Sequence, residues 1–82
     1  MDLRELRKQA NLRIIDVAYR LDVSETTVRN WEKGRSPIRL RLDLIAQLCT
    51  LYSCSIEELN QAMQESIAKA TGKPEGEAGD EQ

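Results

Sequence analysis

The sequence predicts an all-α fold, a compact bundle of five helices that includes a helix-turn-helix. Apolar residues recur at helical spacing in five successive stretches, and capping or turn residues separate these stretches. The apolar side chains are mostly aliphatic, because the chain has no Phe, one Trp and two Tyr. That composition is typical of packed helices rather than of a β-sandwich rich in aromatic residues. At 82 residues, the chain is long enough for one domain with a modest core.

The first two helices are expected over residues 2–10 and 13–21. Asn11 follows the first one, and Asn tolerates the left-handed conformation in which many helices end. The apolar positions of the second helix repeat as i, i+3, i+4 and i+7. The residues expected to form the buried sides of the two helices are Leu3, Leu6 and Ala10, then Ile14, Val17, Ala18 and Leu21.

A tight break after residue 21 leads into a third helix, expected over residues 24–33. Ser24 is a candidate N-cap, because its hydroxyl can accept a hydrogen bond from a free amide of the first turn. We interpret Trp31 as a core residue rather than as a platform on which a base stacks. The buried side of this helix and its end are assigned to Val28, Trp31 and Gly34.

The fourth helix is expected from residue 40 or 41 to residue 52, and the fifth over residues 56–70, opened by a capping box of Ser55 and Glu58. Residues 71–82 have no core-forming side chain and are rich in acidic residues, so they are expected to form a disordered acidic tail after a domain of residues 1–70. One hypothesis is that this tail mimics DNA and screens the basic part of the chain. The apolar residues of the fourth helix are Leu44, Ile45, Leu48 and Leu51 or Tyr52.

Charge is distributed unevenly along the chain, although the net charge is only −2. Residues 1–41 contain ten Lys and Arg against six Asp and Glu, whereas residues 42–82 contain two against eight. The basic half suits a phosphate backbone, because such binding depends on where charge sits and not on the total.

Several classes of function are disfavoured by residue types. The chain has no His, so the usual pairs of a Ser or Cys nucleophile with its base are missing, and we expect no enzyme. Cys49 and Cys54 alone cannot complete a tetrahedral zinc site, so we expect reduced, packed thiols, no metal and no cofactor. No apolar stretch of about 18 residues and no signal-peptide pattern occurs, which predicts a cytoplasmic, nucleoid-associated protein with no membrane partner.

The stretch from residue 12 to residue 35 carries the functional prediction. The helix-turn-helix is expected over residues 13–33 and consists of two short helices joined by a turn of three or four residues. The inward residues of the two helices brace one helix across the other. A major groove about 12 Å wide admits one such braced helix. At about 100° per residue, the residues opposite Val28 and Trp31 are Glu25, Thr26, Arg29, Asn30 and Lys33.

These residues resemble the lambda-repressor/Cro-like helix-turn-helix family, also called the Xre family, over about residues 3–60. The most specific piece is Trp31-Glu32-Lys33-Gly34-Arg35, which follows a capped helix. The resemblance implies a compact five-helix, lambda-repressor-like DNA-binding bundle. The other matching segments are Leu3-Arg4-Glu5-Leu6-Arg7, Val17-Ala18 with Leu21, Val23-Ser24, Val28, Leu48 and Ser55-Ile56-Glu57-Glu58-Leu59.

The resemblance also implies roles for individual residues. Arg7 and Glu32 occupy positions that form a partly buried ion pair, which ties the first helix to the third. Arg29 is placed to read guanine, Asn30 to pair with adenine, and Glu25 to accept from cytosine. The implied base-reading residues are Glu25, Thr26, Arg29 and Asn30. The implied phosphate-binding residues, which set affinity and register, are Thr27, Lys33, Arg35, Arg39 and Arg41.

The sequence departs from the family pattern at its turns. Family members usually have a left-handed Gly where this chain has Asn11, Asp22 and Ser53. Asn and Asp adopt that conformation at tolerable strain, and Ser is a poorer substitute. The second helix usually opens with Thr-Gln, whereas here it opens with Arg13 and Ile14. That change removes a side-chain cap and an amide contact, and Arg13 is expected to reach a phosphate instead.

We therefore expect a sequence-specific regulator of transcription that binds double-stranded DNA, a repressor that inserts residues 24–33 into the major groove as a homodimer. The alternative is the same fold used as a protein-interaction or antitoxin-like adaptor module, with the transcription machinery or another protein as its partner. Glu25 can also act only on the helix dipole, and the Arg residues from 35 to 41 can form only a solvated surface.

The last helix leaves two interpretations open, because its apolar stripe extends beyond the resemblance. The stripe packs back on its own bundle, or it forms a seam with a second copy. A dimer gains specificity by reading two half-sites about one helical turn apart, so we favour a homodimer. The dimer candidates are Ile56, Leu59, Met63, Ile67 and Ala70.

Overall fold

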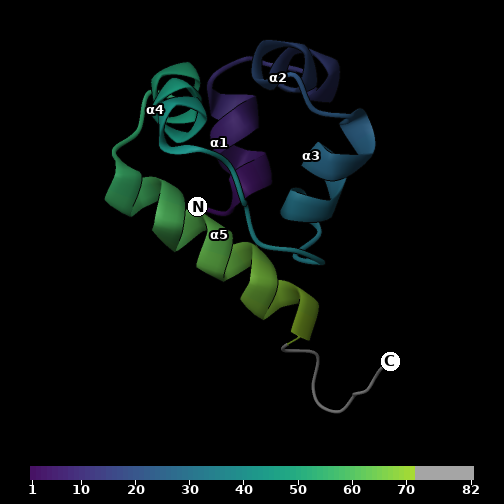
Figure 1. Cartoon of the computed structure of the whole chain (residues 1–82). Coiled ribbons are helices and arrows are strands. Elements are labelled where there is room, and N and C mark those ends of the chain that lie inside the picture. Colours follow the sequence, from purple (N-terminus) through teal and green to yellow (C-terminus); the bar gives the residue numbers. More distant parts are fainter. Residues whose placement is uncertain (72–82) are drawn as a thin grey trace.

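The computed structural model describes residues 1–71 of the chain. These residues form five α-helices and no strand, which confirms the expected fold class (Figure 1). Each helix begins and ends within two residues of its predicted bounds. The tail that the sequence predicts lies, from residue 72 on, outside the described residues. The helices are α1 (Leu3–Gln9), α2 (Ile14–Leu21), α3 (Glu25–Glu32), α4 (Leu42–Leu51) and α5 (Ile56–Thr71).

Three helices are followed by left-handed residues at the positions where the family usually has Gly. The backbone φ angles of Asn11, Asp22 and Ser53 are 63°, 57° and 51°. The amide that follows each left-handed residue donates back into the helix, for example from Val23 to the carbonyl of Ala18. This arrangement satisfies carbonyl groups that a helix end leaves unpaired. The turns therefore keep their geometry without glycine.

Side chains cap the starts of α1, α3 and α5, and α2 begins with a side-chain contact that was not expected from the sequence. Asp2 caps α1: its carboxylate accepts from the amide of Glu5, and the Glu5 carboxylate accepts from the amide of Asp2. Arg13 offers no such acceptor at the start of α2, but Asp16 accepts from the Arg13 amide at 2.8 Å. One half of a capping box therefore replaces the Thr cap of the family.

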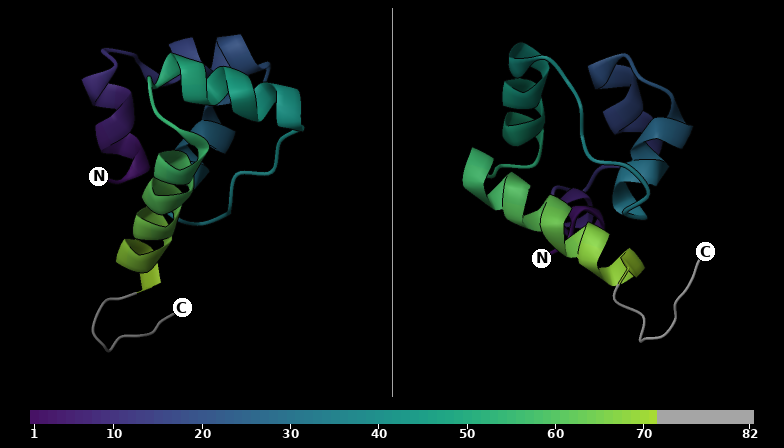
Figure 2. Two further views of the ribbon diagram at one scale, coloured as in Figure 1. Left: turned by 90° about the vertical axis from the view of Figure 1, so that its left-hand side faces the viewer. Right: turned by 60° about the horizontal axis from the view of Figure 1, so that its bottom comes forward.

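The core lies between the four shorter helices and α5, which runs beneath α1 and α3 and carries α4 over its first turns (Figures 1 and 2). Trp31 is a core residue, as expected, with 4% of its surface exposed. Both cysteines are free thiols that pack half-buried against this core. The core residues are Leu3, Leu6, Val17, Ala18, Leu21, Val28, Trp31, Leu48, Tyr52, Leu59 and Ala62.

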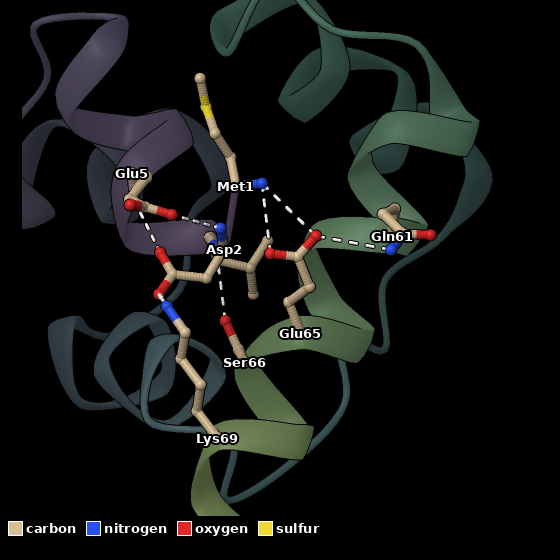
Figure 3. Close-up of polar contacts among 8 residues, drawn as sticks. Met1, Asp2, Glu5, Gln61, Glu65, Ser66 and Lys69 are labelled. Carbon is tan, nitrogen blue, oxygen red and sulfur yellow. Dashed lines mark hydrogen bonds and ion pairs between the residues drawn. The ribbon is translucent and has the colours of Figure 1, made fainter.

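The chain start is fastened to α5 by polar contacts (Figure 3). The amide of Leu3 donates to Oγ of Ser66 at 3.2 Å, and Lys69 pairs with Asp2. The N-terminal ammonium group lies 3.2 Å from a carboxylate oxygen of Glu65. These contacts hold the start of α1 against the C-terminal half of α5. No helix in residues 1–71 combines the length and hydropathy that crossing a bilayer requires.

Candidate nucleic-acid interface

The first turn of α3 is organised by Ser24. The Ser24 hydroxyl accepts from the amide of Thr27 at 3.1 Å, which confirms it as the N-cap. It also lies 2.9 Å from Oγ1 of Thr27. One of the phosphate-binding candidates, Thr27, is thus joined to the cap and lies at the helix N-terminus, where amides attract anions.

The two sides of α3 have opposite environments. Val28 is fully buried, and Trp31 and Glu32 also face the domain interior. The four base-reading candidates lie on the other side: Thr26 and Arg29 are exposed, and Glu25 and Asn30 are half-buried. We call the residues Glu25, Thr26, Arg29 and Asn30 the reading face.

The inner side of α3 is locked to α1 by the Arg7–Glu32 pair. Nε of Arg7 donates to Oε2 of Glu32 at 2.6 Å, and Nη2 donates to Oε1 at 3.1 Å. The remaining Nη1 donates to the carbonyl of Leu12 at 3.0 Å. The two side chains are only 11% and 8% exposed. The hydrogen bond with Glu32 raises the pKa of Arg7 and outweighs burial, so the guanidinium stays charged. Glu32, the last residue of α3, is thus a structural residue.

The same side of the molecule holds a buried phenol. Tyr52 is 4% exposed, and burial raises its pKa well above the ordinary value, with the nearby Glu32 carboxylate acting in the same direction. Tyr52 therefore remains neutral and packs beside the ion pair. It belongs to the scaffold of α3 rather than to the reading face.

An ion pair also crosses the reading face. Nη2 of Arg29 lies 3.2 Å from Oε1 of Glu25, one helical turn away, and the two side chains are 48% and 44% exposed. Such a solvent-exposed pair is weak, contributing about 0.3–0.5 kcal/mol. Arg29 is therefore directed by Glu25 but can exchange it for another acceptor.

The phosphate-binding candidates fall into two groups. Arg13 pairs with Asp16 at 3.2 Å, and hydrogen bonds from Arg13 lower the pKa of Asp16; Arg41 lies 3.5 Å from Asp43. In contrast, Lys33, Arg35 and Arg39 are exposed and form no ion pair with any residue from 1 to 71.

Four of the phosphate-binding candidates lie along residues 33–41, the segment that joins α3 to α4, which we call the basic loop. They are Lys33, Arg35, Arg39 and Arg41. Lys33 and Arg35 directly follow α3, whereas Arg39 and Arg41 lie at the far end of the loop, beside α4 (Figure 1). The structure therefore brings only the first two next to the end of α3.

The dimer candidates mostly face their own domain. Leu59 is 3% exposed and belongs to the core, so its assignment to an interface between copies is corrected. Met63 packs half-buried against the core, and its sulfur accepts from the amide of Ile38 at 3.3 Å. Ile67 and Ala70 lie against Gly34. Ile56 and Ala70 are nevertheless exposed, and 55% of the surface of Ile56 is accessible. Residues 1–71 contain no cluster of acidic, Cys or His side chains that could hold a metal ion.

Comparison with known proteins adds one finding. A family model described as a helix-turn-helix domain matches residues 2–62 of the 82 residues. This match covers α1 to α4 and the first part of α5, and it agrees with the lambda-repressor/Cro-like resemblance. No curated protein and no solved structure matches the chain.

Proposed function

This chain belongs to the helix-turn-helix domain family, whose members bind DNA, and we propose that it is a sequence-specific regulator of transcription that acts as a repressor. The observation that carries the proposal is the contrast between the two sides of α3. Its inner side is fixed by Val28, Trp31 and the Arg7–Glu32 pair, while its reading face is open. A helix with its side chains is about 10–12 Å wide and fits a major groove about 12 Å wide.

The side chains of the reading face match the chemistry of base edges. The Arg29 guanidinium can donate two hydrogen bonds to O6 and N7 of guanine, and the Asn30 amide can pair with N6 and N7 of adenine. Glu25 can accept from N4 of cytosine, and the methyl group of Thr26 can contact thymine. On binding, Arg29 exchanges an exposed carboxylate for a base, which costs little because that pair is weak.

Phosphate contacts would fix α3 in the groove. Thr27 and the first amides of α3 lie at one end of the helix, and Lys33 and Arg35 lie at the other. Arg13 can serve the strand next to α2, whereas Arg39 and Arg41 can act only where the backbone passes close to α4. Such contacts set affinity and register without reading sequence.

One reading helix covers too few base pairs to define a site in a genome, and a homodimer solves this problem by reading two half-sites. Since α5 uses Leu59 and Met63 inside its own domain, the homodimer would be built around Ile56 and other exposed apolar residues. Repression then requires only that the dimer occupies DNA. We place its action at the nucleoid, in the cytoplasm, where the DNA is, and by binding rather than by catalysis.

The test is selection from a pool of random double-stranded DNA, followed by binding of the selected site to variants. We expect an inverted repeat with half-sites about 10 base pairs apart. Arg29→Ala with Asn30→Ala should abolish the preference for this site over random DNA. The matched control, Arg4→Ala with Gln9→Ala, removes the same charge and amide from the exposed side of α1 and should keep it. If selection at low salt enriches no site, α3 does not read bases and the proposal fails.

A second candidate function rests on the outer side of α2. Tyr19 is 84% exposed and Ile15 is 50% exposed, one turn apart, which favours a protein partner at this surface. Salt dependence separates the two functions. Binding through Z phosphates falls with log salt at a slope of about −0.9Z, whereas an apolar interface responds little.

A further inference from the structure

The last turns of α5 lie directly against the basic loop. Gly34 has a φ of +73°, and a Cβ atom built on it would lie 2.3 Å from the carbonyl oxygen of Ser66. The same atom would lie 2.9 Å from Cβ of Ala70. Only glycine permits this approach, because any side chain would overlap the backbone of α5. Figures 1 and 2 show the end of α5 passing under the end of α3.

The opposite side of α5 is fixed as well. Ser66 accepts from the amide of Leu3, and Lys69 pairs with Asp2 (Figure 3). The end of α5 is thus held between the start of α1 and the basic loop. As a result, residue 72 follows only two positions after Ala70, which is held against Gly34.

The chain beyond this point is acidic. Residues 72–82 contain Glu75, Glu77, Asp80 and Glu81 against a single Lys73. An extended chain spans at most about 3.3–3.6 Å per residue, so Glu75 can lie up to about 17 Å from Ala70, and Glu81 up to about 40 Å. The eight residues of α3 span only about 12 Å. The acidic residues can therefore reach Lys33 and Arg35, which flank the Gly34 that lies against Ala70, and can extend along α3.

The nearest cationic groups are those that no acid in residues 1–71 neutralises. Lys33 and Arg35 flank Gly34 in sequence and are exposed, and neither forms an ion pair with a described residue. Lys69 is on this end of α5 itself, but its ammonium group is already paired with Asp2. Lys33 and Arg35 are thus the open cationic positions beside the origin of the acidic segment.

We propose that the acidic segment 75–81 binds Lys33 and Arg35 of its own chain and competes with DNA phosphates for them. The inference rests on the proposed function, since it assigns these two residues to the DNA backbone. A short tether of this length gives an effective concentration in the millimolar range, so even a weak contact is substantially occupied. The segment then lowers affinity for any DNA and leaves the sequence preference unchanged, because it covers phosphate-binding residues and not the reading face.

The contact is tested first without DNA. The probe is the backbone amide resonances of residues 33–36 in the full chain, compared with a variant of the same length carrying Glu75→Gln, Glu77→Gln, Asp80→Asn and Glu81→Gln. We expect these resonances to differ at about 0.01 M salt, where the Debye length is about 30 Å, and to coincide at about 1 M, where it is about 3 Å. Identical resonances at both salt concentrations would overturn the inference.

Competition is tested with a random-sequence duplex. The neutral variant should bind about two- to ten-fold more tightly than the parent at low salt, and the gap should narrow as salt rises. In a background of Lys33→Gln and Arg35→Gln, the gain from neutralising the segment should disappear. In a control background of Arg4→Gln and Lys8→Gln, which removes two exposed cations from α1, it should persist.

The outcomes separate this inference from the proposed function. If the gain is equal in both backgrounds, the segment repels DNA through its overall field, and the contact with Lys33 and Arg35 is wrong. If neither chain binds any duplex at low salt, the proposed function fails, while the amide resonances still decide whether the contact exists.

Discussion

Helix α3 takes part in two Arg–Glu pairs with the same chemistry and opposite environments. Glu32 pairs with Arg7 on the inner side, at 2.6 Å, with both side chains almost completely buried. Glu25 pairs with Arg29 on the outer side, at 3.2 Å, with both side chains about half exposed. The first pair joins two residues that are 25 positions apart and lie in different helices, and the second lies within one turn of a single helix.

The difference shows that burial decides which pair is structural and which is free to exchange its partner. A buried charge that loses its partner has no water to replace it, so the inner pair cannot open without a large loss of stability. An exposed pair exchanges its partner for water or another acceptor at almost no cost. One side of this short helix is therefore fixed rigidly to the domain, while the charged side chains on its other side can exchange their partners.

The largest effect is expected for the inner pair. Glu32→Gln should lower the free energy of unfolding by about 3 kcal/mol, because the buried Arg7 guanidinium loses its counter-charge. Urea denaturation measures this loss, with Arg29→Ala as a control that should change it by less than about 0.5 kcal/mol. The double change Arg7→Met with Glu32→Leu should restore at least half of the stability. If Glu32→Gln and Arg29→Ala lower the unfolding free energy by the same small amount, burial does not distinguish the two pairs.

The second effect concerns the cap that orients both sides of α3. Ser24→Ala removes the acceptor for the Thr27 amide and should cost about 1 kcal/mol in unfolding free energy. Ser55→Ala removes the equivalent bond to the Glu58 amide at the start of α5 and should cost a similar amount. DNA affinity, measured for both variants below their unfolding temperatures, should fall only for Ser24→Ala. A similar loss for Ser55→Ala would show that the cap acts through stability alone.

A third pair, Asp2–Lys69, has intermediate burial, with side chains 14% and 61% exposed. Burial alone would raise the pKa of Asp2, but hydrogen bonds from Lys69 and the Glu5 amide outweigh it, and the pKa is lowered. A carboxyl group with a lowered pKa in the folded state stabilises the protein above its unfolded pKa of about 3.9, and this contribution is lost as the pH falls.

Asp2→Asn keeps a capping side chain and removes only the charge. It should therefore lower the unfolding free energy by about 0.5 kcal/mol at pH 7, and the difference from the parent should shrink as the pH drops toward 3. Thermal unfolding of the parent and of the variant, followed between pH 7 and pH 3, measures how the stability of each depends on pH. A constant difference across this range contradicts the assigned role of the charge.

The smallest effect on stability is expected for the outer pair. Glu25→Gln should change the unfolding free energy by less than about 0.3 kcal/mol, because the pair is exposed. By releasing Arg29, the same change should raise affinity for random DNA by about two-fold, as the competing carboxylate is worth only a few tenths of a kcal/mol. Titration of a labelled random duplex checks this result, and a fall in affinity would indicate that Glu25 itself contacts DNA.

Much of the fold could be predicted because its signals are local. Ser24 and Ser55 mark helix starts, and Asn11, Asp22 and Ser53 mark positions just past helix ends, so the bounds of the helices follow from residue types within a few positions. The capping box of Asp2 and Glu5 has the same kind of signal and could have been found by its spacing. The Glu25–Arg29 pair was equally readable from its spacing of four.

Other features could not be predicted because they depend on packing between distant segments. The Arg7–Glu32 pair was expected only through the family resemblance, since nothing in the spacing of two residues 25 apart indicates contact. The contacts of α5 with Gly34 and with the chain start are of the same kind. The spacing of the apolar residues of α5 was equally compatible with packing inside the domain and with packing against a second copy. Burial of Leu59 shows that the domain itself covers part of this apolar stripe.

The fastening of the chain start to α5 has a consequence for how the protein is made. The bonds from Leu3 to Ser66 and from Lys69 to Asp2 join residues 63 and 67 positions apart. A ribosome adds about 5–20 residues per second, so α1 waits roughly 3–13 s for its partner helix. During that interval Leu3 and Leu6, both core residues, lack the surface that will cover them. Chains released before α5 is complete would keep these side chains exposed and would be open to proteases.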